Sequence, residues 1–281
     1  MATLATDDPA VVLADLAAGL RAGSVLPYLG PGISALEDPA VPMTPEALAG
    51  FMGSKVRLPA RAVGNLWASA QYIESFKHRQ TVTALMAEAF AESVAPSALH
   101  RWLAELAPTL VVDSWYGGEM RRALAGQDGW AEVQGTHRAV ITDPAWYRFY
   151  AADGAECDPE AVERAATLLY TPHGSIAPAG NFLVSDADYV EVLTEIDIQT
   201  PIPEEVRRRR TGKSFLFLGC HFHDQLLRSY ARQIIKRSGP EHFAVLELDK
   251  LTRNELRFLE EQDISVIDLP LPAAIALLLE S

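Results

Sequence analysis

A histidine followed at once by a glycine stands at the end of a short apolar run, where it could carry acid–base chemistry. Residues 170–176 read Tyr-Thr-Pro-His-Gly-Ser-Ile. This order predicts a strand that delivers the imidazole of His173 to a turn, in which glycine lets the backbone come close to a ligand. Because the ordinary pKa of histidine lies near neutrality, His173 is a candidate general base. The structural alternative is a buried, hydrogen-bonded histidine at a strand end.

Two further segments place glycine directly after a predicted strand. Residues 30–34 read Gly-Pro-Gly-Ile-Ser after a strand at 25–29, and residues 219–224 read Gly-Cys-His-Phe-His-Asp after a strand at 214–218. Glycine there lets the backbone approach a phosphate, and a following helix N-terminus favours negative charge. Tight turns need glycine in any case, so neither segment alone specifies a nucleotide site. The candidate ligand-binding residues are Gly30, Gly32, Ser34, Gly219, Cys220, His221 and Asp224.

Other interpretations of these polar residues stay open. His221, His223 and Asp224 could bind a metal. Residues two apart share a side only in an extended segment, however, and the sequence shows no further protein ligand beside them. Cys220 could be a reactive thiol at a helix start, and Asp224 could be only the cap of that helix. The arginine run at 207–210 predicts a solvated helix end, or otherwise a docking site for an acidic partner or a phosphate.

The overall composition excludes several classes of partner. The chain has 281 residues, is 49% hydrophobic and carries a formal net charge of −13, which disfavours a nucleic-acid-binding or anionic-membrane surface. The sequence has no apolar run that could span a bilayer and no signal-peptide pattern, so we expect a cytoplasmic protein. Its two cysteines cannot build a four-cysteine zinc site.

The pattern of elements predicts an α/β fold with a Rossmann-like parallel sheet and helices on both faces. Apolar strands alternate with helical patterns, most clearly in the second half. We expect a single domain over 1–281, with residues 127–165 as a less regular, aromatic-rich insertion. Ligands of such sheets bind at the carboxyl ends of the strands. The strands are expected at 25–29, 109–112, 166–171, 182–185, 214–218, 243–248 and 264–268, and the helices at 45–52, 61–76, 80–93, 97–106, 116–125, 186–194, 224–237, 251–261 and 272–279.

Taken together and in this order, the motifs resemble the SIR2-like superfamily, the sirtuin-type NAD-binding fold, in its zinc-free bacterial branch. Residues 26–34 look like that family's Gly-Ala-Gly-x-Ser turn, and residues 170–176 resemble its Leu-His-Gly motif with the catalytic histidine. Residues 185–189, Ser-Asp-Ala-Asp-Tyr, resemble its Thr-x-x-Asp-Tyr helix start, and residues 216–224 resemble its Leu-Gly-Tyr-Ser-x-x-Asp turn. The resemblance spans roughly residues 20–270. It implies an NAD or ADP-ribose-type nucleotide as ligand, and no zinc.

The departures from that pattern fall on the reacting side of the implied pocket. Residues 113–117 read Asp-Ser-Trp-Tyr-Gly where the family has Thr-Thr-Asn-Tyr-Asp, so Trp115 replaces the asparagine that helps to place the water. Indole has one donor, no acceptor and much greater bulk, so it could fill the nicotinamide space. Pro31 has no N–H for a phosphate, and the acidic segment 37–39 would repel a pyrophosphate. These changes imply altered or lost NAD chemistry.

Two functions therefore follow from the sequence. The favoured one is a non-catalytic relative that senses a nucleotide or acts as an accessory, regulatory protein, with a protein partner or a second copy as a further possibility. The alternative is an NAD glycohydrolase in which His173 is the base and Ser114, or a backbone group, places the water. Zinc-dependent protein deacylation is not expected, since the sequence has no zinc ribbon. Whether the chain is an enzyme is left open at this point.

Overall fold

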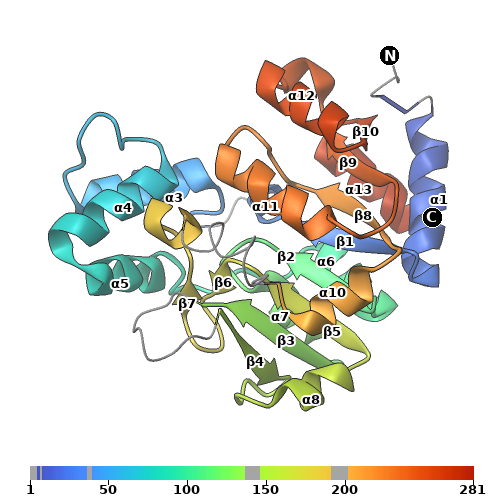
Figure 1. Ribbon diagram of the computed structural model, residues 1–281, viewed down its shortest axis with the longest axis horizontal. Helices are drawn as coiled ribbons and strands as arrows, with labels where there is room; N and C mark the ends of the chain where they lie inside the picture. The colour runs from blue at the N-terminus through green and yellow to red at the C-terminus, as the bar shows by residue number, and fades with distance from the viewer. Residues whose placement is uncertain (1–4, 7, 37–39, 137–145, 191–201) are drawn as a thin grey trace.

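The computed structural model describes residues 5–6, 8–36, 40–136, 146–190 and 202–281. Within them an eight-stranded sheet runs in the order β10-β9-β8-β1-β2-β5-β3-β4 (Figure 1). Every neighbouring pair is parallel except β3 and β4, so the predicted Rossmann-like α/β class is confirmed. The strands are β1 (Val25–Leu29), β2 (Leu110–Asp113), β3 (Trp130–Gly135), β4 (Tyr147–Ala151), β5 (Thr167–Thr171), β8 (Ser214–Leu218), β9 (His242–Leu246) and β10 (Ile264–Asp268).

Helices cover both faces of this sheet. One face packs against α8 (Pro159–Glu163), α10 (Glu204–Arg210), α11 (Gln225–Ile235) and α12 (Arg253–Glu261). The other packs against α1 (Pro9–Ala22), α6 (Ala98–Leu106), α7 (Glu119–Leu124) and α13 (Leu271–Glu280). The packing of β8 on both faces explains why its sequence is apolar throughout. Phe215 and Phe217 enter the first core, whereas Leu216 and Leu218 enter the second, because a strand covered on both faces has no solvent side.

A helical lobe stands beside the sheet, at the left of Figure 1. It consists of α3 (Pro45–Lys55), α4 (Leu66–Lys77) and α5 (Arg79–Ala89), and it has its own buried core. Trp115, Tyr116 and Phe182 belong to that core although they follow strands of the sheet region. The lobe is therefore joined to the sheet through the segments that follow β2 and β5.

Local capping explains where the lobe begins. The Thr44 hydroxyl accepts a hydrogen bond from the Ala47 N–H at 3.1 Å, and Pro45 takes the first helical position, as predicted. The helix then continues to Lys55 rather than ending at Met52. Likewise α4 begins only at Leu66, after the Asn65 cap, and not at residue 61.

Three predictions of secondary structure need correction. The segment 127–165, predicted as less regular, contains β3, β4 and α8, and its two strands complete one edge of the sheet. The helix α1 is missing from the predicted elements, although Leu13, Leu16 and Leu20 recur at helical spacing and are buried. The predicted strand 182–185 is shorter: β7 (Asn181–Phe182) pairs only with β6 (Gly174–Ser175). Residues 186–190 are helical, and the rest of that predicted helix lies outside the described residues.

Arg209 and Arg210 of the run on α10 are buried, whereas Arg208 is exposed, so the prediction of a solvated helix end is wrong for the second half of the run. Arg209 donates to the carbonyl oxygens of Thr109 at 2.6 Å and Ala165 at 2.7 Å. Arg210 donates to the carbonyl oxygen of Gln233 at 2.7 Å, near the end of α11. These guanidinium groups satisfy carbonyl groups that burial would otherwise leave without donors.

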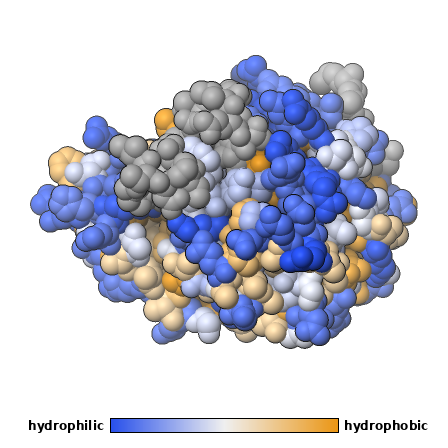
Figure 2. Space-filling model, turned by 60° about the horizontal axis from the view of Figure 1, so that its bottom comes forward, coloured by the Kyte–Doolittle hydropathy of each residue, from blue (hydrophilic) through white to orange (hydrophobic). Residues whose placement is uncertain are grey.

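None of the helices in the described ranges is long and apolar enough to cross a bilayer. On the face shown in Figure 2, hydrophilic and apolar side chains are interspersed.

Two glycine turns meet in direct backbone contact at the centre of the sheet. A Cβ atom on Gly30 would lie 2.4 Å from the carbonyl oxygen of Gly219, and one on Gly219 would lie 2.6 Å from the backbone nitrogen of Ile33. Gly219 also has a positive φ of 66°. Both residues must be glycine because the turns touch, whether or not a ligand is present.

We predict that Gly30→Ala lowers the free energy of unfolding by about 2–3 kcal/mol, because one of the two turns must move. Gly50 is the matched control, since it lies on the exposed side of α3 and a Cβ atom there would meet nothing within 4 Å. Gly50→Ala should instead stabilise the protein by about 0.5–1 kcal/mol. Urea unfolding followed by circular dichroism measures both, and equal effects would contradict this account.

Candidate functional site

The sequence-predicted motifs meet at the point where the order of the strands reverses. From β1 the chain moves outward to β2 on one side, and it later returns to β8 on the other side. Ligands of open α/β sheets bind in the crevice outside the carboxyl ends of the strands at such a point. Gly30, Ser114 and Gly219 directly follow β1, β2 and β8, and His173 follows β5 by two residues.

A cavity of about 170 Å³ opens at this place. Of the predicted site residues, those that line it are Gly32, Ser114, Trp115, His173, Cys220 and His221. Gly30, Ser34, Gly219 and Asp224 are not among its lining residues. Sequence reasoning missed Tyr28, Trp67, Tyr116, Glu46 and Phe222, which also line it. A signal existed for Tyr28, Tyr116 and Phe222, because they lie inside the motif segments 26–34, 113–117 and 219–224.

His173 is buried at the wall of this cavity, with one ring nitrogen bonded and the other not. Its Nδ1 lies 3.1 Å from the Ser114 carbonyl oxygen, which can only accept, so Nδ1 carries the proton. Its Nε2 is buried without a hydrogen-bond partner among the described residues. Burial lowers the pKa of His173 to about 4, against the opposing effect of the Ser114 hydrogen bond. The imidazole is therefore neutral at pH 7.

Aromatic rings enclose the imidazole of His173. The ring centres of Tyr189 and Tyr230 lie 5.4 Å and 5.0 Å from it, both edge-on. The Tyr230 hydroxyl is held by the Tyr170 hydroxyl at 2.6 Å. These contacts fix the orientation of the His173 imidazole and cover its edges. Such an environment is as typical of a structural histidine as of a general base.

The segment after β2 is held by short backbone contacts. The Ser114 hydroxyl donates to the Leu29 carbonyl oxygen at 2.8 Å, so its only hydrogen is committed to joining β1 and β2. Trp115 packs its ring edge-on against Phe90 at 6.1 Å and tilted against Tyr116 at 5.1 Å. The indole is thus part of the lobe core and also one wall of the cavity, and it leaves the cavity open.

The first glycine turn has few free donors for a phosphate. The Gly30 N–H donates to the Leu218 carbonyl oxygen at 2.8 Å, and the Gly32 N–H donates to the Gly219 carbonyl oxygen at 2.9 Å. Pro31 has no N–H. The predicted acidic segment 37–39 lies outside the described residues.

Two buried carboxyl groups, Asp113 and Glu119, are not among the lining residues of the cavity, and the sequence did not single them out. A Cβ atom on Gly117 would lie 2.4 Å from Glu119 Oε1, so the glycine leaves room for this carboxylate. Burial raises the pKa of Glu119, and hydrogen bonding from Ser34 is among the opposing effects. Burial also raises the pKa of Asp113 to about 8, with the nearby Glu119 adding to the shift. Ser34 therefore contacts an acid rather than the cavity.

The turn after β8 forms part of the cavity wall through Cys220, His221 and Phe222. Cys220 is buried, and burial raises its thiol pKa well above the ordinary value, so the thiol is not reactive by ionisation. Across the described part of the chain, no group of three or more histidine, cysteine or acidic residues could hold a metal ion. His223 Nε2 instead lies 3.7 Å from Oε1 of Glu46, a residue of α3 that lines the cavity.

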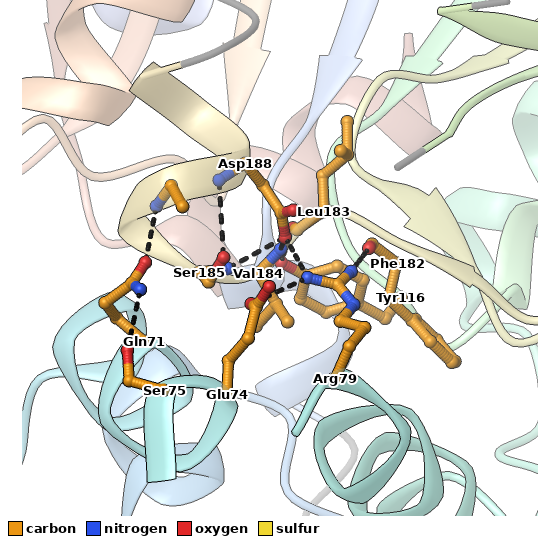
Figure 3. Close-up of polar contacts among 11 residues, drawn as sticks. Gln71, Glu74, Ser75, Arg79, Tyr116, Phe182, Leu183, Val184, Ser185 and Asp188 are labelled. Carbon is orange, nitrogen blue, oxygen red and sulfur yellow. Dashed lines mark hydrogen bonds and ion pairs between the residues drawn. The ribbon is translucent and has the colours of Figure 1, made fainter. Parts of the chain in front are cut away.

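One arginine ties the helical lobe to the segment that follows His173 (Figure 3). Arg79 Nη1 lies 2.7 Å from Asp188 Oδ2 and 3.1 Å from Glu74 Oε2, and Nη2 donates to the Phe182 carbonyl oxygen. The same Asp188 oxygen accepts from the backbone N–H groups of Val184 and Ser185 at 2.9 Å and 3.0 Å. The neighbouring Tyr189 packs on Trp67 of α4 at 5.5 Å as well as on His173.

We predict that Arg79→Met lowers the free energy of unfolding by about 2–4 kcal/mol, because it removes the cation paired with a fully buried carboxylate. Lys55→Met, on the exposed lobe pair Lys55–Glu88, should cost less than about 1 kcal/mol. Urea unfolding compares the two. A Lys55→Met loss as large as that of Arg79→Met would refute a special role for the Arg79 contacts.

A second prediction concerns pH. Since the pKa of His173 is about 4 in the folded protein and about 6.5 when unfolded, the unfolded chain binds an extra proton between these values. Stability contributed by His173 is therefore present above pH 6.5 and lost as pH falls toward 4. The difference in unfolding free energy between wild type and His173→Gln should shrink over this range, by at most about 1.4 kcal/mol per pH unit. Urea midpoints at several pH values test this, and a constant difference would exclude a neutral, buried imidazole.

Residues 109–267 match the protein-family model described as SIR2-like domain, which is more than half of the chain. The match begins just before β2, ends within β10 and includes Trp115, His173 and Gly219. The turn after β1 lies before it. No curated protein matches the chain.

Proposed function

Because the chain belongs to the SIR2-like family, we propose that it binds an NAD-type or ADP-ribose-type nucleotide at the cavity beside His173 without cleaving it. It is then a zinc-free, non-catalytic member that serves as a nucleotide sensor or as an accessory, regulatory protein. The domain class itself carries a nucleotide-related function. The position of the cavity, at the strand ends where the sheet order reverses, supports the same kind of ligand.

The observation that carries the non-catalytic part is the state of His173. Its protonated nitrogen is bound to the Ser114 carbonyl, and its lone-pair nitrogen is buried without a partner among the described residues. A general base must lie within hydrogen-bond reach of the proton that it takes. His173 lines the cavity, but its Nε2 is buried and the rings of Tyr189 and Tyr230 pack against the imidazole, so a ribose hydroxyl in the cavity does not meet an exposed lone pair.

NAD hydrolysis is the alternative activity. It would break the bond between ribose C1′ and the nicotinamide nitrogen, add the hydroxyl of water to C1′ and pass the remaining proton to a base. The neutral imidazole of His173 could accept that proton at pH 7. The placement of water is less well supported, because Ser114 donates its only hydrogen to the Leu29 carbonyl and Trp115 stands where the family has asparagine.

Further parts of the proposal rest on the sequence alone. We regard the chain as one domain over residues 1–281 that works in the cytoplasm. Its response to nucleotide would be passed to a protein partner or to a second copy of the chain. The arrangement of Arg79 supports such a response, since the lobe, Tyr189 and His173 are in contact and would move together.

We predict that pure protein binds NAD in titration calorimetry and releases no nicotinamide above the buffer rate. Trp67→Leu, which removes a ring from the cavity wall, should weaken binding by about tenfold or more. His173→Ala is assayed for nicotinamide release beside the wild type.

Nicotinamide release that disappears in His173→Ala would replace the non-catalytic proposal with the glycohydrolase. Absence of binding to both NAD and ADP-ribose would sink both nucleotide functions and leave a structural or assembly role.

A further inference from the structure

The helix α13, at the end of the chain, is apolar on its exposed side as well as on its buried side. Residues 271–279 read Leu-Pro-Ala-Ala-Ile-Ala-Leu-Leu-Leu, without one charged side chain. Ala274 and Leu278 are buried in the core on one face of the sheet, whereas Ala273 and Ala276 are exposed. A surface helix ordinarily carries polar residues on its outer face. The sequence of α13 is therefore typical of a helix that is covered on both sides.

Two neighbouring helices continue this apolar surface. The helix α13 packs against α1 and α6, and the C-terminus lies beside α1 (Figure 1). On α1, Val11 is 57% exposed, and Ala14 and Ala18 are exposed as well. On α6, Trp102 is partly exposed, and the guanidinium carbon of Arg21 lies 5.8 Å from the centre of its ring. Tryptophan and arginine are residue types that often anchor protein interfaces. We call the outer surface of these three helices the α1–α13–α6 face.

The charged side chains on this face carry both signs. The three helices expose the carboxylates of Asp15, Glu105 and Glu280 and the guanidinium groups of Arg21 and Arg101, which leaves one net negative charge. The whole chain carries −13. Two copies of the chain therefore repel each other over most of their surface but not at this face, where acidic and basic groups of one copy can meet those of the other. A basic partner would find more negative charge elsewhere on the molecule.

The size of the α1–α13–α6 face also fits a second copy. The three helices have 14, 10 and 9 residues. At about 1.5 Å per residue and about 10 Å of width per helix, their outer sides cover roughly 500 Å² in projection. The relief of the side chains raises the accessible area above this flat value, toward the about 600 Å² per partner of the smallest specific interfaces. Such a face supports a reversible dimer rather than a permanent one.

From these observations we propose that the α1–α13–α6 face is a dimer interface, on which a second copy of the chain packs through the same three helices. A two-fold interface uses the same patch on both copies, so α13 of one copy packs on α13 of the other. The small side chains of Ala273 and Ala276 let these two helices approach closely. The inference goes beyond the proposed function and does not depend on nucleotide binding.

Sedimentation velocity of the full chain tests the interface. The wild type should pass from monomer to dimer over about 1–100 µM, the range expected for a contact of this size. Ala276→Glu should weaken the dimer by at least about tenfold, because it buries two carboxylates in an apolar contact. The matched control is Ala84→Glu, which changes an exposed alanine in the middle of α5, on the helical lobe. It should leave the dimer unchanged.

A mixture of two variants identifies the occupant of the face as a second copy. Ala276→Glu and Ala276→Lys should each be monomeric at concentrations at which the wild type is a dimer. Equal amounts of the two should form a mixed dimer, because opposite charges then lie across the interface. Circular dichroism shows that each variant keeps its helices.

The other outcomes each overturn the proposal. A wild type that stays monomeric over the whole range excludes a second copy as the occupant and leaves the face to a different partner or to a lipid surface. A dimer that survives Ala276→Glu is held together by another surface. A dimer that Ala276→Glu abolishes but the mixture does not restore excludes the packing of α13 on its own copy. None of these results bears on NAD binding, so the proposed function is tested separately.

Discussion

The rest of the structure depends on the direct contact between two glycine turns at the centre of the sheet. Gly30 and Gly32 lie against the backbone of Gly219 so closely that no side chain fits between them. This contact closes β1 against β8 at the point where the strand order reverses, and so it creates the crevice. It also uses the N–H groups of both glycines in hydrogen bonds to β8 and the turn after it. The same packing that builds the pocket thus removes donors that a phosphate would need.

Burial decides the chemistry that remains. His173 lies just after β5, with the rings of Tyr189 and Tyr230 packed against it. The cost of desolvation there keeps the imidazole neutral. The same cost raises the pKa of Asp113 to about 8 and also raises that of Glu119, whose Oε1 lies 3.5 Å from Arg122 Nη2. The lining of the cavity is largely aromatic, and Glu46 is the only carboxylate among its described lining residues.

The helical lobe makes the pocket a shared feature of two parts of the fold. Trp67 and Glu46 reach the cavity from the lobe, while Ser114 and His173 reach it from the sheet. Arg79 joins the two by pairing with the buried Asp188, whose carboxylate also caps the short helix at 186–190 (Figure 3). Tyr189 contacts both Trp67 and His173, so this one ring packs against residues from both parts of the cavity wall.

The sequence by itself determined the α/β class, the position of most strands along the chain and the place of the motifs at strand ends, because apolar periodicity and glycine turns are local signals. It also led to His173, Trp115 and Cys220 as residues of one pocket. Only the tertiary structure decided which polar groups remain available to bind a ligand. That Arg209 is buried, that Ser34 faces Glu119 and that the Gly32 N–H is occupied all depend on partners distant in sequence. A motif fixes which groups the chain carries, whereas long-range packing fixes which of them a ligand can reach.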